Sequence, residues 1–227
     1  MLPDSRLQAV ASLVRDGARF ADIGTDHAYL PIHLLESGRI LSAVAADVAE
    51  GPLLRARRNV EEAGLSDKIT LLLADGLTGM DDLGLTDIAI CGMGGELIAS
   101  ILSAAPFVRD GRVRLILQPM TRTAELRQYL AKEGFAVLCE RYAVAAGRAY
   151  TCLCVTYSGT SYPIDPVTAV LGTSSLRDER DTVAYAAFLD EREREARARI
   201  RGRLAGGADI GGDEILLAAI AAEREKL

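Results

Sequence analysis

Short apolar segments that end at acidic or glycine-rich turns alternate with amphipathic segments, and this alternation constrains the fold more than any other feature. Short apolar runs between turn residues predict buried strands, whereas apolar residues three and four apart predict helices. Strands that alternate with helices form a parallel sheet covered on both faces. The predicted strands are residues 19–23, 42–48, 69–74, 86–91, 112–117, 136–143 and 150–157, and the predicted helices are residues 4–16, 26–36, 52–63, 97–104 and 123–133.

The last two predicted strands and the chain after them depart from this alternation. No helix separates the two strands, so we expect a hairpin around Ala146-Gly147-Arg148 that adds one antiparallel strand. Residues 158–163 are typical of a linker. Residues 177–203 are densely charged at broken helical spacing, and residues 213–225 form another amphipathic segment. We therefore predict one domain at residues 1–158 and a helical, coiled-coil-like domain at residues 159–227.

Composition excludes several classes of protein. Hydrophobic residues make up 49% of the chain, and a net charge of -6 argues against binding nucleic acid through overall charge. The four cysteines form no CxxC pair, and two histidines leave few ligands for zinc, so we expect reduced thiols and no metal. We find no signal-peptide pattern and no apolar run near the ~18 residues of a membrane span, so we expect a cytoplasmic protein without membrane contact.

The first predicted strand ends in Asp22-Ile-Gly-Thr-Asp26, which differs from the GxGxxG pattern of a dinucleotide site. His27 and Ala28 stand where further glycines would allow the backbone to approach a pyrophosphate. The loop therefore favours a cofactor without a pyrophosphate. S-adenosylmethionine is such a cofactor, and an acidic side chain can bind its ammonium group. The alternative is that Asp22 and Asp26 cap the following helix.

The next three strands also end in acidic or glycine residues. Asp47 ends the second strand, where a carboxylate can hold ribose hydroxyl groups, and Asp75 ends the third, where it can accept from an adenine amino group. Cys91-Gly-Met-Gly-Gly95 ends the fourth, and its glycines either accommodate a flat substrate or allow close packing of strand and helix. Carboxyl ends of parallel strands meet at one edge of the sheet, so we expect these residues to share a site.

Together these motifs resemble the TrmK family of bacterial tRNA methyltransferases. The run from Ala21 to Pro31 carries most of the resemblance, which covers roughly the first 155 residues. It implies an α/β fold, namely a class I methyltransferase (Rossmann-like) with a mostly parallel seven-stranded sheet and a C-terminal helical tail. Shorter motifs recur in the family's order: Gly51-Pro52, Asn59-Val60, Asp75-Gly-Leu77, Gly92-Met-Gly-Gly95 and Leu115-Ile-Leu-Gln-Pro119.

The resemblance implies transfer of a methyl group from S-adenosyl-L-methionine to N1 of adenine 22 in tRNA. It places the methionine end of the cofactor at the first loop, the ribose at the second strand and the adenine at the third. Three groups of residues follow: catalytic Asp26, His27 and Tyr29; cofactor-binding Asp22, Gly24, Thr25, Asp47, Val48, Asp75, Gly76, Cys91 and Gly92; and substrate-binding Met93, Gly94, Gly95, Gln118 and Pro119.

Three positions depart from the family pattern. Cys91 replaces the usual Ala and is conservative in size, whereas Met120 replaces an Asn and removes a polar group that could contact the base. The segment Tyr150-Thr-Cys departs from the usual Tyr-Glu-Ile, so the role of the last strand is open.

The implied chemistry needs no strong base. Adenine N1 has an in-plane lone pair that attacks the methyl group directly, so catalysis depends mainly on positioning and desolvation. We expect Asp26 to stabilise the cationic product, His27 to accept a proton where one is released, and Tyr29 to stack on the base. Helix-start packing is the alternative for His27 and Tyr29. The chain lacks the Asn/Asp-Pro-Pro-Tyr/Phe pattern, which favours a ring nitrogen over the exocyclic amine.

An acidic protein needs a local cationic track to bind tRNA. Alternatives remain open at this stage: methylation of another RNA or of a small molecule, a non-catalytic RNA-binding module of the same fold, or a nicotinamide dehydrogenase. The oligomeric state is also open, with a monomer as the working expectation. The candidate cations are Arg55, Arg57, Arg58, Lys68, Arg122, Arg127 and the arginines between residues 192 and 203.

Overall fold

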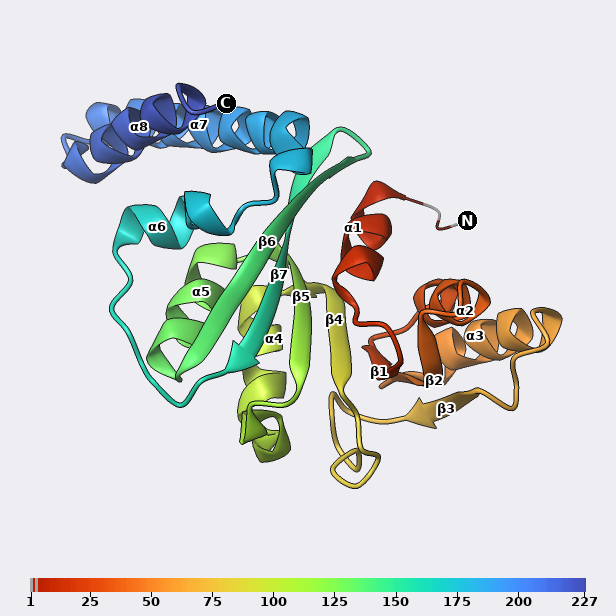
Figure 1. Cartoon of the computed structure of the whole chain (residues 1–227). Coiled ribbons are helices and arrows are strands. Elements are labelled where there is room, and N and C mark those ends of the chain that lie inside the picture. The colour runs from red at the N-terminus through yellow and green to blue at the C-terminus, as the bar shows by residue number, and fades with distance from the viewer. Residues whose placement is uncertain (1, 3) are drawn as a thin grey trace.

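The computed structural model describes residues 2 and 4–227 and contains a seven-stranded sheet (Figure 1). The strands lie in the order β3-β2-β1-β4-β5-β7-β6, and β7 runs antiparallel to both of its neighbours, whereas the other pairs are parallel. The prediction of a mostly parallel sheet with one added antiparallel strand is therefore confirmed. The strands are β1 (Ala18–Ile23), β2 (Ile40–Asp47), β3 (Ile69–Leu73), β4 (Asp87–Gly94), β5 (Arg114–Thr121), β6 (Phe135–Ala145) and β7 (Arg148–Tyr157).

Helices cover both faces of the sheet. Consecutive residues of a strand point to opposite faces, so each strand packs its apolar side chains against helices on both sides. Phe20 of β1 is fully buried against one set of helices, and its neighbour Ala21 is buried against the other. Burying a side chain such as Phe20 contributes about 2–3 kcal/mol. One face holds α1 (Ser5–Leu13), α2 (Tyr29–Glu36) and α3 (Glu50–Glu62); the other holds α4 (Gly95–Ser103), the short helix η1 (Pro106–Asp110) and α5 (Thr123–Lys132).

Two boundaries differ from the predictions at the edge where the strands end. Helix α2 begins at Tyr29 instead of residue 26, because Ala28 adopts a left-handed conformation with φ of 55° that interrupts the helix before it. Strand β4 continues through Gly94, since Met93 pairs with Pro119 and Gly94 with Thr121 across two register shifts. The glycine-rich segment is therefore an irregular strand instead of a turn.

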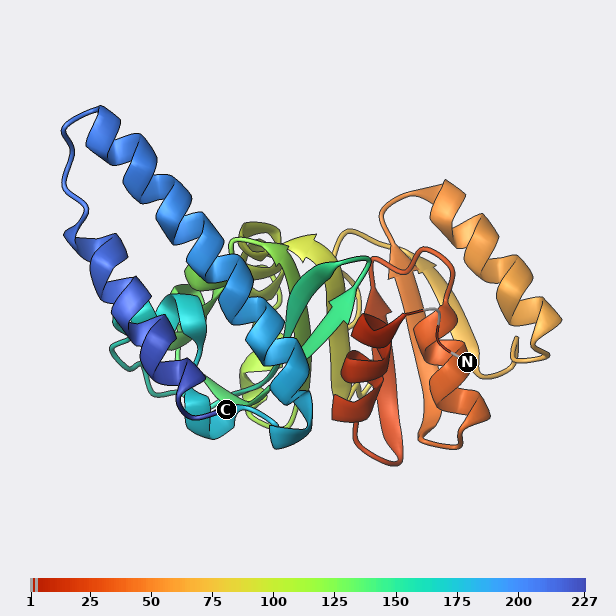
Figure 2. The same cartoon turned by 90° about the horizontal axis from the view of Figure 1, so that it is seen from above.

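The C-terminal part is helical, as predicted, and its last two helices form an antiparallel hairpin that projects from the body of the sheet (Figure 2). Helices α7 (Thr182–Ala205) and α8 (Gly211–Arg224) lie side by side, and Arg199 of α7 contacts Asp213 of α8 at 2.8 Å. Coiled-coil packing of this pair stays a prediction. The sequence did not predict α6 (Pro166–Leu171), which Asp165 caps, or the short helices η2 (Ser174–Leu176) and η3 (Glu179–Asp181).

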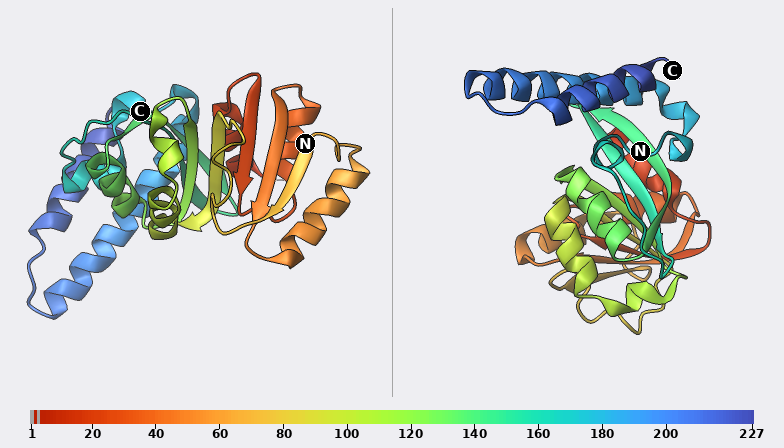
Figure 3. Two further views of the ribbon diagram at one scale, coloured as in Figure 1. Left: turned by 90° about the horizontal axis from the view of Figure 1, so that it is seen from below. Right: turned by 90° about the vertical axis from the view of Figure 1, so that its left-hand side faces the viewer.

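A buried ion pair fixes the tail to the sheet. Arg127 of α5 and Glu140 of β6 are each about 2% exposed, and Arg127 Nη2 donates to Glu140 Oε2 at 2.7 Å. The same arginine donates from Nη1 to the Ala169 carbonyl of α6, and Tyr142 Oη donates to Glu140 at 2.7 Å. Tyr142 belongs to the same apolar cluster as Tyr185 and Phe188 of α7. The tail therefore shares a core with the last hairpin, and Figure 3 shows it seated above that hairpin.

No helix in the described part of the chain combines the length and apolarity that crossing a membrane requires.

Candidate active site

The site lies between β1 and β4, where the strand order reverses direction. From β1 the chain proceeds outward to β2 and β3, whereas β4 and β5 build the other half of the sheet. Open α/β sheets bind ligands in the crevice that forms at such a point. A cavity of about 350 Å³ is present there, called the first cavity below. It is lined by Asp4, Arg6, Leu7, Asp22, Gly24, Thr25, Asp26, His27, Ala28, Tyr29, Leu30, Cys91 and Gly92.

Close contacts hold the loop after β1 against its neighbours. The backbone NH groups of Gly24 and Thr25 both donate to the Ala46 carbonyl of β2, at 2.8 and 2.9 Å. Gly24 has φ of 77°, and a Cβ atom there would lie 2.2 Å from Met93 Cε. The positive φ favours glycine at this position, whereas the close neighbour is the far end of a flexible methionine. Met93, predicted to contact substrate, packs over the loop after β1 in this structure.

Asp22 is the buried charge of the first cavity. Its side chain is 8% exposed, and burial raises the pKa of its carboxyl to about 6, with a further upward contribution from Asp47. The Thr25 hydroxyl opposes this pKa shift, although it makes no hydrogen bond of good geometry with any described residue. Desolvation and the nearby Asp22 raise the pKa of the Cys91 thiol, which is therefore neutral at physiological pH. The first cavity thus presents one buried carboxyl group that a cationic ligand group can bind, with Asp4, Asp26 and Arg6 also in its lining.

Asp26 and His27 form a polar rim held by α3. Arg55 Nε donates to Asp26 Oδ1 at 3.0 Å, and His27 Nε2 lies 3.3 Å from Asp26 Oδ2. Asn59 Nδ2 donates to the His27 carbonyl at 2.8 Å. The His27 ring stacks on Tyr29 at a centroid distance of 5.0 Å, and Tyr29 remains 44% exposed. The three predicted catalytic residues therefore lie together at the mouth of the first cavity.

The capping interpretation of the two acids is wrong. Helix α2 begins after Ala28, and no side chain forms a capping hydrogen bond with its first turn. Asp22 lies within β1, and Asp26 is engaged by Arg55. Neither carboxylate therefore caps this helix.

Arg6 is a site residue that the sequence analysis missed. Its Nη1 donates to Gln118 Oε1 at 2.6 Å, and the same oxygen accepts from Gly92 N at 3.1 Å. Asp4 lies 3.5 Å from Arg6 Nη2. One signal was present: a cation in the first turn of a helix opposes the helix dipole, so Arg6 needs an external partner. Asp4 also caps α1 by accepting from Leu7 N at 2.9 Å.

Gln118 lies behind the first cavity instead of lining it. The residue is fully buried, and while its Oε1 binds Arg6 and Gly92, its Nε2 donates to the Pro119 carbonyl at 2.9 Å. With its amide engaged on both sides, Gln118 has the geometry of a residue that positions its neighbours.

The remaining predicted cofactor residues continue the same edge outside the first cavity. Asp47 ends β2 and accepts from Ala49 N at 2.8 Å, and its neighbour Val48 is 70% exposed. Asp75 follows β3 and is exposed. Gly76 has φ of 57°, and a Cβ atom there would press on Ile101 at 3.1 Å. These residues form an open shelf beside the first cavity.

Gly94 and Gly95 allow two strand ends to approach each other. A Cβ atom on Gly95 would lie 2.3 Å from the Arg122 carbonyl oxygen, and one on Gly94 would lie 3.3 Å from Thr121 Oγ1. Close packing, which the sequence left open as an alternative, therefore explains Gly95. A substrate contact by these glycines stays a prediction. Pro119 lines a second cavity, described below.

Among the described residues, no group of three or more His, Cys, Asp or Glu side chains is placed to hold a metal ion.

Known methyltransferases have sequences similar to that of this chain. A family described as a methyltransferase domain matches residues 3–153. The tRNA (adenine(22)-N(1))-methyltransferase of Bacillus subtilis is 40% identical over 148 residues, which cover 65% of this chain and 62% of that relative. The aligned part therefore spans less than two thirds of the relative's length.

Solved structures extend the similarity to the tail. The Bacillus subtilis M1A22 tRNA methyltransferase TrmK is 32% identical with a TM-score of 0.73, and the match covers 99% of this chain and 96% of that one. A Streptococcus pneumoniae protein solved in complex with S-adenosyl-L-methionine is 33% identical with a TM-score of 0.83, covering 96% and 99% of the two chains.

Proposed function

The chain belongs to the TrmK family of tRNA methyltransferases, and from this premise we propose that it methylates N1 of adenine 22 in tRNA with S-adenosyl-L-methionine as donor. The observation that carries the proposal is the first cavity, which offers one buried carboxylate and one guanidinium in a space of about 350 Å³. An amino acid moiety, with its ammonium and carboxylate groups, needs both charges.

The cofactor fits this donor set. Asp22 would accept from the methionine ammonium group, and Arg6 would bind the methionine carboxylate through a charge-assisted hydrogen bond. Asp47 would hold the ribose, and the exposed Val48 and Asp75 would meet the adenine. When bound, S-adenosylmethionine supplies an electrophilic methyl group on a sulfonium. Gln118 then acts as a positioning residue, because it holds Arg6 and Gly92 together.

The rim residues would act on the target base. The N1 lone pair attacks without prior loss of a proton, and the product base carries a positive charge. The Asp26 carboxylate would stabilise that charge, while Arg55 and His27 keep the carboxylate in place. The exposed ring of Tyr29, which His27 supports from one side, would stack on adenine. Adenine N1 is hidden in a base pair, so the target must leave its helix to reach this rim.

The structure narrows the set of cations available to tRNA. Arg127 is buried against Glu140 and cannot reach RNA, so its assignment to the cationic track is wrong. Arg57 and Arg58 are exposed on α3, the helix that also carries Arg55. We also propose a cytoplasmic location, where tRNA is found; the four free cysteines support a reducing compartment.

The target atom is tested by comparing substrates. We expect methyl transfer to a tRNA with adenine at position 22 and none to the same tRNA with guanine there. Equal transfer to both would contradict the proposed target while leaving a methyltransferase of another specificity.

The catalytic rim is tested with Asp26→Ala, His27→Ala and Tyr29→Ala, each measured for single-turnover transfer and for cofactor affinity. Asp26→Ala should slow transfer at least about tenfold, equivalent to about 1.4 kcal/mol of transition-state stabilisation. Unchanged turnover in all three variants would remove the assignment. Substitution of Arg19, an exposed residue of β1 remote from the first cavity, serves as the control.

A further inference from the structure

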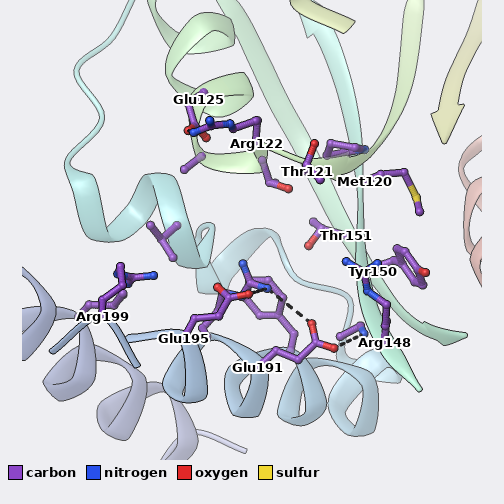
Figure 4. A pocket seen from close by; sticks show the side chains of 18 residues that line it. Met120, Thr121, Arg122, Glu125, Arg148, Tyr150, Thr151, Glu191, Glu195 and Arg199 are labelled. Carbon is purple, nitrogen blue, oxygen red and sulfur yellow. Dashed lines mark hydrogen bonds and ion pairs between the residues drawn. The ribbon is translucent and has the colours of Figure 1, made fainter. Parts of the chain in front are cut away.

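A second cavity of about 380 Å³ lies between the sheet and the tail (Figure 4). Most of its lining comes from the connection between β5 and α5, the tip of the β6–β7 hairpin and α7 of the tail. Val170 of α6 and Leu216 of α8 complete it. Met120, Arg122, Arg148 and Tyr150 line the sheet side, whereas Glu191, Arg192, Glu195 and Arg199 line the tail side.

Tyr150 connects the two cavities. The Arg6 guanidinium, which lines the first cavity, lies 5.8 Å from the centroid of the Tyr150 ring, and the Arg148 guanidinium lies 5.9 Å from it. Figure 4 shows Tyr150 and Arg148 next to each other on β7, with Met120 nearby on β5. The ring is half-buried, and Arg148 is exposed. The Tyr150 ring therefore connects the two cavities, with one guanidinium group from each cavity close to it.

The charges of the second cavity are mostly paired. Arg122 contacts Glu125 at 2.9 Å, Arg192 contacts Glu195 at 3.0 Å, and Arg199 contacts Asp213 at 2.8 Å. Arg148 differs, since it forms no ion pair with any residue that the structure describes. The second cavity therefore has few unpaired cations with which to bind a polyanion. It offers one available cation beside an aromatic ring.

We propose that the second cavity binds a nucleotide adjacent to the target adenine, whose base stacks on Tyr150 and whose phosphate contacts Arg148. Splayed single-stranded bases stack on aromatic rings and guanidinium planes, and phosphates pair with arginine. The inference rests on the proposed function, because a target base that leaves its helix carries its neighbour toward Tyr150. The Met120 side chain gives this base an apolar contact in place of a polar one.

The experiment measures tRNA binding by Tyr150→Ala, Tyr150→Phe and Arg148→Ala, with Arg19→Ala, an exposed position near the amino end of β1, as a matched control. Stacking contributes about 1–3 kcal/mol per base, so Tyr150→Ala should weaken tRNA binding about 5- to 150-fold, and Tyr150→Phe should restore most of it. Arg148→Ala should lower the slope of log affinity against log salt by about 1. Cofactor affinity should remain at the wild-type value in all four variants.

A spectroscopic readout separates stacking from a structural effect. A tRNA that carries 2-aminopurine on either side of adenine 22 should lose fluorescence on binding wild-type protein at one of the two positions, and Tyr150→Ala should abolish that quenching. Wild-type quenching and affinity in Tyr150→Ala would overturn the inference while methyl transfer by the wild type continues. Absence of transfer by the wild type would instead contradict the proposed function.

Discussion

Asp22 couples stability to pH through its burial. Because burial raises the pKa of its carboxyl to about 6, the folded chain binds this proton more tightly than the unfolded chain. Below about pH 3 the group is protonated in both states. As the pH rises through 6, the carboxyl ionises in a desolvated position, and its contribution to stability is lost.

The first prediction concerns Asp22→Asn in the cofactor-free protein. At pH 8 the variant should be more stable than the wild type by up to about 3 kcal/mol, and the difference should vanish below about pH 3. Urea unfolding across this range measures it. A difference that is the same at every pH would show that the Asp22 carboxyl has no raised pKa.

A second prediction follows for ligand binding at the same residue. The cofactor ammonium group should bind the ionised carboxylate, so cofactor affinity should fall as the pH drops through about 6, approaching tenfold per unit below it. Asp22→Asn should bind the cofactor weakly at all pH values and remove this dependence. Calorimetric titration measures both proteins, and an unaltered pH dependence in the variant would assign it to another group.

At the scale of elements, two glycines differ in their surroundings: one is closely packed against backbone, and the other faces open space. Gly95 begins α4 against the backbone of Arg122, whereas Gly202 lies within α7 with no atom near its missing side chain. Gly95→Ala should destabilise the protein by about 1–3 kcal/mol, because a backbone carbonyl must move. Gly202→Ala should stabilise it by up to about 1 kcal/mol. Thermal unfolding of the pair tests this prediction, and equal melting temperatures would contradict it.

Local patterns explain which elements the sequence could predict. The strands and the acids at their ends follow from residue periodicity and strand-end position, and both are properties of short segments. The proximity of Arg6 and Tyr150 could not be predicted from the sequence, because it arises where α1 packs on the last hairpin. There Ser5 Oγ donates to the Val144 carbonyl at 2.6 Å. The left-handed conformation of Ala28 was not predicted either, because it is set by the surrounding residues and not by the residue type.

At the scale of the whole molecule, charge is concentrated in the projecting tail. Residues 194–203 contain five arginines and one glutamate in a chain whose net charge is -6. Arg194 and Arg201 form no ion pair within the described residues, whereas Arg199 and Arg203 contact Asp213. The division at residue 158 stays a prediction, since Tyr142 shares a core with the tail.

Deleting the tail would therefore disrupt the sheet. A more specific test of RNA contact by the tail replaces only Arg194 and Arg201 with Ala. If both contact phosphates, tRNA affinity should weaken and the salt slope should fall by about 2, while cofactor affinity and melting temperature remain those of the wild type. An unchanged salt slope would exclude these two arginines from the interface.

Nucleoside mass spectrometry of tRNA incubated with the protein and S-adenosylmethionine tests the proposed function most directly. We predict 1-methyladenosine in the digest and, after sequence-specific cleavage, its location in the fragment that contains adenine 22. N6-methyladenosine, a methylated guanosine, or 1-methyladenosine in another fragment would contradict the assignment of the reaction.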